Sequence, residues 1–317
     1  MSTSVTSPKC KAPPKKTIMK NRLSTANYRL VLLGFEDWLK TLGYSKVTVY
    51  QAPRYIKEFL CYLESNNITN ITECHLGLPA YLEYFKNRPN KRKEGGLSVA
   101  HINKQIDSLN KFFKYLNLTE QNLNNIKLQQ LKNEASLPSF LTKEEIEELY
   151  KVTDNSLLGI RDRAMLGLYY GCGLRKSEGL SLKVEDILFD RRLVYVKHTK
   201  NNYERYVPIS IRVLQDLESY IYRVRPILDN GAAKDALLLT EIGNPMKTST
   251  PIYRLKKLQK ATDNPELQDK EVGIHTLRHS IATHLLQAGM ELEQISLFLG
   301  HKTLDSTQIY THITQEI

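Results

Sequence analysis

A polar stretch near the middle of this 317-residue chain separates two parts with different apolar patterns. Residues 119–138 are rich in Asn and Gln and end at Pro138, a composition typical of a linker. Before them, apolar residues recur at helical spacing. After them, helical runs alternate with two short β-rich runs. The pattern therefore predicts a helical domain at 23–118 and a second domain at 139–317, mainly α with a small antiparallel β-sheet.

The last helical run of the first domain, at 98–117, has two distinct faces. Its apolar stripe consists of Ile102, Ile106, Leu109, Phe113 and Leu116. The other side, at about 100° per residue, carries Lys104, Lys111 and Lys114 with Asn103 and Asn110. A solvated surface is the simplest interpretation of this polar face. A basic loop, KNRPNKRKEGG, precedes the helix.

Charge points to a partner more clearly than to a fold. Residues 1–22 contain six Lys or Arg, three Pro and no acid, which predicts a basic disordered tail. Over the whole chain, 45 Lys and Arg against 34 Asp and Glu give a net charge of +11. This excess favours nucleic acid as a partner, although solubility alone also explains it.

The cysteines form no CxxC pair, and no apolar run is long enough for a signal peptide or a membrane span. We therefore expect a cytoplasmic protein with no metal site and no membrane contact.

Two positions in the second domain suit phosphate chemistry. Arg175 follows a Gly-Cys-Gly turn, whose glycines permit tight backbone turning. It could present a two-pronged donor to a phosphate, with a structural salt bridge as the simpler alternative. The runs LVYV and RYVPI predict a hairpin at 192–209 with Lys197 and Lys200 at its tip. A tip lysine is either solvated or able to donate a proton in a groove.

The stretch IHTLRHSIATHLL at 274–286 predicts a helix that Thr276 caps. Its apolar stripe consists of Leu277, Ile281, Leu285 and Ala288. On a helical wheel of about 100° per residue, His275, Arg278 and His279 share a face away from that stripe. The positive end of the helix dipole adds to their charge, so the pattern favours an anion site.

The order of these residues along the chain is more specific than any one of them. The stretches GLRKSE, HTKNNYERYVP, HTLRHSIATHLL and LGHKTLDSTQIYTHI contain the series Arg175, Lys200, His275, Arg278, His301 and Tyr310. This series resembles the tyrosine recombinase, or integrase, family, and Xer-like members in particular. The resemblance is specific over residues 138–312 and implies a SAM-like core-binding domain followed by an α+β catalytic domain.

The resemblance also implies a function and roles for the matched residues. The expected protein is a site-specific DNA recombinase, of the kind found on mobile elements, that cuts and rejoins DNA. Arg175 and Arg278 would hold the non-bridging oxygens of the scissile phosphate. His275 and His301 would hydrogen-bond that phosphate or shuttle a proton.

The remaining roles concern the nucleophile, the acid and two supporting residues. Tyr310 would attack the phosphate and form a 3′-phosphotyrosyl link. Lys200 would protonate the leaving 5′ oxygen, with Lys197 as the less favoured alternative. His279 would brace the site and Glu178 would support Arg175. Fewer residues follow Tyr310 than in many members, which leaves the coupling between neighbouring subunits open.

The expected partner is double-stranded DNA, bound by a homotetramer on two synapsed sites, with accessory DNA-bending or directionality proteins. Candidate backbone contacts are Lys91, Arg92, Lys93, Lys104, Lys111 and Lys114. No cofactor is expected. Two alternatives stay open: a type IB topoisomerase-like enzyme that shares the chemistry, and a catalytically inactive DNA-binding regulator.

Overall fold

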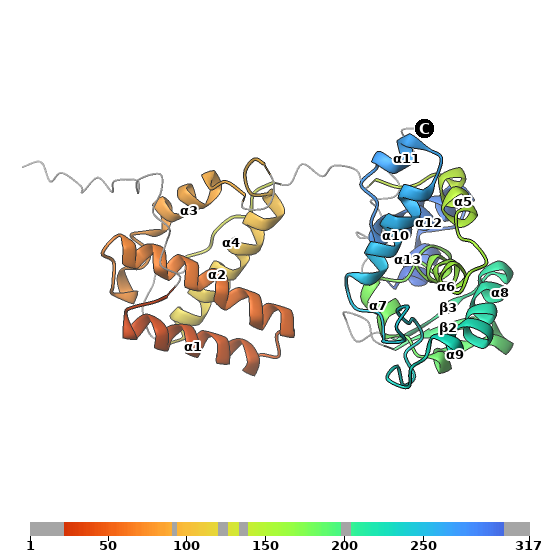
Figure 1. Ribbon diagram of the computed structural model, residues 1–317. Helices are drawn as coiled ribbons and strands as arrows, with labels where there is room; N and C mark the ends of the chain where they lie inside the picture. Colours follow the sequence, from red (N-terminus) through yellow and green to blue (C-terminus); the bar gives the residue numbers. More distant parts are fainter. Residues whose placement is uncertain (1–21, 91–93, 120–125, 133–138, 198–203, 301–317) are drawn as a thin grey trace, which may run out of the picture. The chain divides into compact units, whose positions relative to one another are not determined.

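The computed structural model describes residues 22–90, 94–119, 126–132, 139–197 and 204–300 (Figure 1). The chain divides into two compact units, Met1–Ala135 and Ser136–Ile317, and each has its own hydrophobic core. Both are mostly helical, and the described residues form one small antiparallel sheet, in the second unit. The predicted fold class is confirmed.

The N-terminal unit is a helical bundle. Its helices are α1 (Ala26–Thr41), α2 (Lys46–Ser65), the short 3-10 turn η1 (Ile71–Glu73), α3 (Leu78–Asn87) and α4 (Val99–Leu118). Aromatic rings fill its centre, with Phe35 edge-on to Phe112 at 5.3 Å between ring centroids. Ser45 and Ser98 accept backbone N–H groups and so cap α2 and α4.

Residues 126–132 belong to this unit, although their composition predicted part of a linker. The side-chain amide of Asn110 donates to the Leu128 carbonyl at 3.0 Å and accepts from the Leu128 N–H at 2.8 Å. Asn103 makes the same two bonds with Leu131, also at 3.0 and 2.8 Å. Ile126, Leu128 and Leu131 pack against the core beside these bonds. Two residues assigned to a solvated face therefore hold a peptide segment on α4.

The C-terminal unit combines helices with a small sheet. The elements before and within the sheet are α5 (Lys143–Lys151), α6 (Leu157–Leu166), the π-helix η2 (Gly167–Gly171), α7 (Lys176–Ser181), η3 (Val184–Asp186), β1 (Ile187–Leu188), η4 (Phe189–Arg191), β2 (Leu193–Val196) and β3 (Arg205–Pro208). The strands pair in the order β1-β2-β3, with Val196 opposite Arg205. The hairpin is confirmed, and β1 is an additional strand that the sequence did not indicate.

The second half of this unit is helical. Its elements are α8 (Ile211–Ser219), the π-helix η5 (Tyr220–Val224), α9 (Arg225–Leu228), α10 (Thr250–Ala261), α11 (Pro265–Asp269), α12 (Ile274–Gln287) and α13 (Leu292–Leu299). A β-carbon on Gly171 would lie 2.6 Å from Val213 Cγ2, so glycine lets η2 pack closely on α8. The capping box between Thr142 and Glu145 is confirmed at the start of α5.

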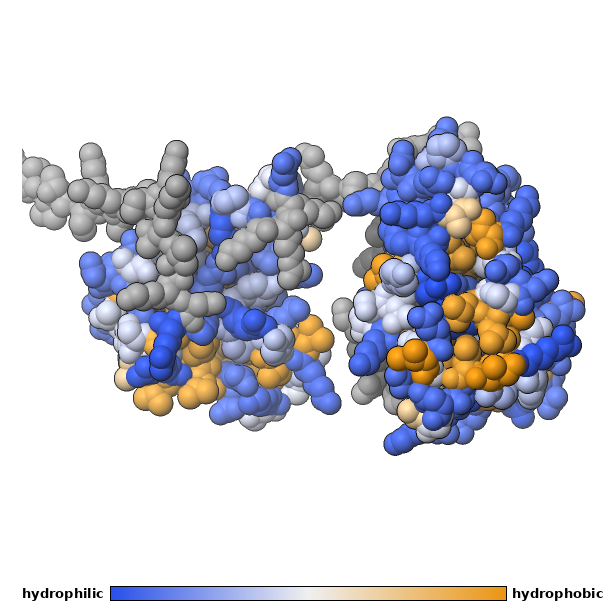
Figure 2. Space-filling model, viewed as in Figure 1, coloured by the Kyte–Doolittle hydropathy of each residue, from blue (hydrophilic) through white to orange (hydrophobic). Residues whose placement is uncertain are grey.

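The surface of each unit is mainly hydrophilic, with apolar patches on the face that Figure 2 shows. Exposed large apolar side chains include Leu33 of α1 and Ile227 of α9. Within the described ranges, no helix combines the length and apolar character needed to cross a membrane.

Candidate active site

The site begins with the turn that delivers Arg175. Gly173 has a φ of +58°, in the left-handed region that favours glycine. A β-carbon there would lie 2.9 Å from Leu299 Cδ2 and 3.0 Å from Phe298 Cε1. Glycine therefore allows the turn after η2 to lie directly against the end of α13. Arg175 follows as the N-cap residue of α7.

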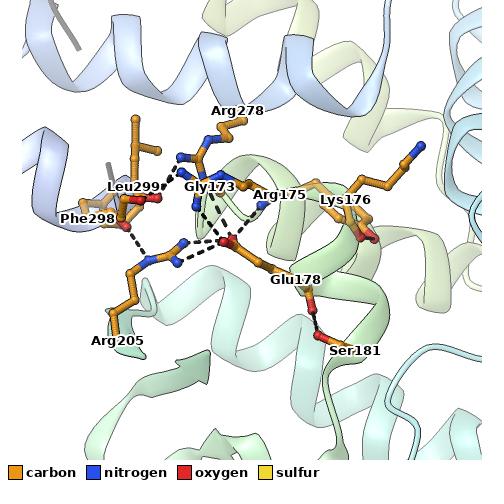
Figure 3. Close-up of polar contacts among 11 residues, drawn as sticks. Gly173, Arg175, Lys176, Glu178, Ser181, Arg205, Arg278, Phe298 and Leu299 are labelled. Carbon is orange, nitrogen blue, oxygen red and sulfur yellow. Dashed lines mark hydrogen bonds and ion pairs between the residues drawn. The ribbon is translucent and has the colours of Figure 1, made fainter. Parts of the chain in front are cut away.

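Glu178 lies at the centre of a cluster of guanidinium groups (Figure 3). Its carboxylate accepts from Arg175 Nη1 at 2.7 Å and from the Arg175 backbone N–H at 2.9 Å. It also accepts from Arg205 Nη1 at 3.1 Å and Nη2 at 3.0 Å. Arg278 Nη1 lies 3.9 Å from the same carboxylate. One fully buried acid thus organises three arginines from three separate elements.

The ionisation of Glu178 follows from these partners. Burial alone raises the pKa of its carboxyl group, but the hydrogen bonds and charge of Arg205, followed by those of Arg175, lower it to about 2. Glu178 is therefore ionised at neutral pH. Its single charge leaves the three guanidinium groups with a net formal charge of +2.

The same arginines bind the carboxyl-terminal end of α13. Arg205 Nε donates to the Phe298 carbonyl at 3.2 Å, Arg278 Nη2 to the Leu299 carbonyl at 2.7 Å, and Arg175 Nη2 to the Gly300 carbonyl at 2.9 Å. The last carbonyls of a helix lack partners within the helix and carry its partial negative charge. The arginines give these carbonyls hydrogen-bond donors and offset the partial negative charge. Gly300, with a φ of +68°, ends the helix.

The prediction that Arg278 lies on an outward face of α12 is wrong. Arg278 is only 4% exposed and also donates to the Gly173 carbonyl at 2.7 Å, so it does not lie on an outward face. Ala288, predicted to be in the apolar stripe, is exposed at the end of the helix. Gly273 is the N-cap residue, and its N–H donates to the Thr276 hydroxyl at 3.0 Å. The single-stripe view fails because neighbouring elements cover α12 on several sides.

His275 and His279, the two histidines in the first half of α12, differ in exposure. His275 is exposed, and His279 is half-buried. Desolvation, followed by the charges of Arg278, Lys176 and Arg175, lowers the pKa of His275. Desolvation, followed by the charges of His275 and Arg278, lowers the pKa of His279 to about 4. His279 is therefore a neutral imidazole at pH 7.

Lys197 has carboxylate partners of its own. Its Nζ lies 2.8 Å from Asp186 and 3.2 Å from Glu185. Hydrogen bonds to Asp186 and then to Glu185 raise the pKa of Lys197 above its usual value. A lysine bound in this way is a weaker proton donor. Lys200, its rival, lies outside the described residues.

The predicted DNA contacts are only partly within the structure. Lys104 and Lys114 are exposed on α4. Lys111 forms an ion pair with Asp107, and its Nζ lies 5.8 Å from the centroid of the Tyr44 ring. The other predicted residues that lie outside the described ranges are Lys91, Arg92, Lys93, His301 and Tyr310.

Arg205 is the residue of the cluster to which the sequence assigned no role. A signal was present: Arg205 and Val207 face the buried side of β3, whereas Tyr206 and Pro208 face outward. An arginine at an inward position of an alternating strand requires a buried acid, and that acid is Glu178. In the parts of the chain that the structure describes, no group of His, Cys, Asp or Glu is arranged to hold a metal ion.

Comparisons with known proteins show which family this chain resembles. The family described as the phage integrase family matches residues 139–316. The tyrosine recombinase XerC of Bacillus subtilis is 34% identical over 283 residues, which cover 87% of this chain and 88% of that protein. A XerH site-specific recombinase has the same fold, and its structure is a post-cleavage complex with a palindromic difH substrate. The TM-score is 0.64 at 20% identity, over 93% of this chain and 96% of that chain. A lambda integrase dimer bound to a COC′ core site gives a TM-score of 0.62 at 18% identity, over 87% of this chain and 95% of that one.

Proposed function

Since the chain belongs to the phage integrase family of tyrosine recombinases, site-specific enzymes that break and rejoin DNA, we propose that its reaction takes place at the arginine cluster around Glu178. The observation that carries this proposal is the convergence of Arg175 and Arg278 on Glu178 and on the last carbonyls of α13. The relatives are site-specific recombinases, which favours recombination over a topoisomerase-like activity or an inactive regulator.

Arg175 and Arg278 bind the scissile phosphate through its non-bridging oxygens. Phosphoryl transfer depends mainly on positioning and on charge stabilisation, and fixed guanidinium groups supply both. Arg175 is the more accessible of the two, with 20% of its side chain exposed against 4% for Arg278. The net positive charge that Glu178 leaves uncompensated is available to a phosphodiester.

The histidines contribute hydrogen bonds in this scheme. His275 is exposed beside the cluster, and a bound phosphate would favour its protonated form by adding a negative charge. His279 stays neutral and braces the same turn of α12. His301 follows Gly300 in the sequence and acts as a second donor to the phosphate.

Tyr310 is the nucleophile and Lys200 is the acid. The phenolic oxygen of Tyr310 gives its proton to a neighbouring base and attacks phosphorus, and the bond from phosphorus to the 5′ oxygen breaks. Lys200 gives a proton to that oxygen, which leaves as a hydroxyl group, and the enzyme retains a 3′-phosphotyrosyl link. A cationic surrounding lowers the pKa of a phenol from about 10 and so assists the attack. The bond energy is kept for resealing by another 5′-hydroxyl.

The substrate is double-stranded DNA, and we propose a homotetramer on two synapsed sites, with accessory DNA-bending or directionality proteins as further partners. The exposed lysines of α4 contact the DNA backbone in this proposal, as do Lys91, Arg92 and Lys93. A cytoplasmic location and the absence of a cofactor stay predictions.

A covalent trapping assay tests the mechanism. The protein is incubated in EDTA with nicked duplexes from which the short 5′-hydroxyl strand is lost after cleavage, so that the adduct accumulates. We expect a protein–DNA band on a denaturing gel that is missing with Tyr310→Phe. A band that persists in Tyr310→Phe would assign the nucleophile elsewhere. Exchange of strands between two marked duplexes, rather than relaxation of supercoils alone, distinguishes a recombinase from a topoisomerase-like enzyme.

A further inference from the structure

Arg205 is a buried charge, and within the described ranges all of its contacts lie in the protein framework. Its side chain is 6% exposed, and its donors bind both oxygens of Glu178 and the Phe298 carbonyl. Arg175, by contrast, keeps 20% of its side chain exposed. Arg205 therefore belongs to the cluster without being placed to touch a substrate.

The first effect of Arg205 is on the charge of Glu178. Each oxygen of this carboxylate is shared, Oε1 between Nη1 of Arg175 and Nη1 of Arg205, and Oε2 between the Arg175 backbone N–H and Nη2 of Arg205. Without Arg205, a fully buried carboxylate would have to be neutralised by the two remaining arginines. Those are the arginines that the proposed function assigns to the phosphate.

The second effect is on the end of α13. Arg205 Nε donates to the Phe298 carbonyl, and its guanidinium group lies close to Gly300. A β-carbon on Gly300 would lie 2.8 Å from Nη1 and 2.9 Å from Cζ of Arg205. Arg205 thus supports the backbone at the point where Arg175 binds the Gly300 carbonyl.

We propose that Arg205 is a positioning residue of this site: it neutralises Glu178 and supports the end of α13, so that Arg175 and Arg278 remain available to the scissile phosphate. The proposal rests on the proposed function for the role of the two arginines. It predicts a coupling between Arg205 and Glu178 that a residue needed only for folding would not produce in the reaction rate.

The test measures adduct formation, at saturating protein, for Arg205→Met, Glu178→Gln and the double variant. Arg191→Met, at an exposed arginine of η4, is the matched control. We expect Arg205→Met to slow the adduct at least 100-fold while DNA affinity changes less than threefold. Adding Glu178→Gln should raise the rate of adduct formation at least tenfold above that of Arg205→Met, because Arg175 then no longer has to neutralise a buried carboxylate. A rate for Arg205→Met within threefold of the wild type, or no recovery in the double variant, overturns the proposal.

Two further measurements keep the outcomes separate. If Arg205→Met does not fold, Arg205→Lys takes its place: it keeps the charge but cannot bind both carboxylate oxygens and the Phe298 carbonyl, so we expect about tenfold slower cleavage. An unchanged rate in Arg205→Lys would also contradict the proposal.

A crystal structure of the variant that folds reports on positioning without any reaction, and we expect Arg175 and Gly300 to be displaced. Displacement with no adduct from the wild type would reject the proposed function alone, and an undisplaced site would reject the positioning role.

Discussion

Arg175 binds Glu178 twice, through its backbone N–H at 2.9 Å and through Nη1 at 2.7 Å. The residue that is proposed to hold the phosphate is therefore fixed at both ends by one buried acid. This relationship links the stability of the fold to the chemistry of the site.

Glu178→Gln should reduce the stability of the fold. The carboxyl pKa is lowered from 4.5 to about 2 in the folded protein, so its contribution to stability is present above pH 4.5 and is lost as the pH falls toward 2. We expect the variant to be destabilised by about 3 kcal/mol at pH 7. Denaturant unfolding of both proteins at several pH values between 7 and 3 measures this. Parallel stability curves for the wild type and variant would contradict it.

His279→Gln should weaken the pH dependence of stability. The pKa of His279 falls from 6.5 to about 4 on folding, so the unfolded chain binds its proton first. The wild type should therefore lose stability as the pH falls from 6.5 to 4, and the variant should lose less. Thermal unfolding across this window gives the comparison. An equal slope in both proteins would show that His279 titrates normally.

The two asparagines of α4 should protect separate amides. Asn103→Ala removes the acceptor for the Leu131 N–H, and Asn110→Ala removes the acceptor for the Leu128 N–H. Each change should cost about 1–3 kcal/mol, because a partly buried backbone group loses its partner. Hydrogen exchange read amide by amide should show faster exchange at Leu131 only in the first variant and at Leu128 only in the second. Lys104→Ala, at an exposed position, is the control and should change neither.

Lys104→Glu and Lys114→Glu should each weaken binding to any duplex, because we propose that these exposed lysines contact the DNA backbone and not the bases. Each lost phosphate contact should reduce the slope of log affinity against log salt by about 0.9. Lys111→Glu should have a smaller effect, since Asp107 already pairs with Lys111. Fluorescence anisotropy at a series of salt concentrations measures the slopes. Unchanged affinity would remove these lysines from the interface.

Lys200→Ala should slow cleavage much more than Lys197→Ala, because Asp186 and Glu185 bind Lys197 and raise its pKa. Loss of a general acid typically costs about 10²–10⁴-fold in rate. A substrate with sulfur in place of the bridging 5′ oxygen needs no proton to leave, so it should restore the rate of Lys200→Ala. If sulfur gives no recovery, Lys200 acts in another step.

The helices could be predicted from the sequence because their apolar periodicity is local. The turn before Arg175 is also local, because its glycines lie next to that residue in the sequence. The support from Glu178 was expected only from the family resemblance. Arg205 was missed because it is 93 positions from Phe298, and no local pattern reports such a distance. Its inward position on β3 was the available signal. The contact between Arg175 and the Gly300 carbonyl, 125 positions apart, involves a backbone atom that every residue has.

In the segment at 126–132, the spacing between the two leucines that are bound matches the spacing between the two asparagines of α4 that bind them. Asn103 and Asn110 are seven residues apart on α4, a rise of about 10.5 Å. Leu128 and Leu131 are three residues apart, which in extended chain spans about 10 Å. Because the two lengths agree, the segment has one register on the helix. Inserting or deleting one residue between Leu128 and Leu131 would leave one asparagine without its backbone partner, so this part of the chain is constrained in length far more than in composition.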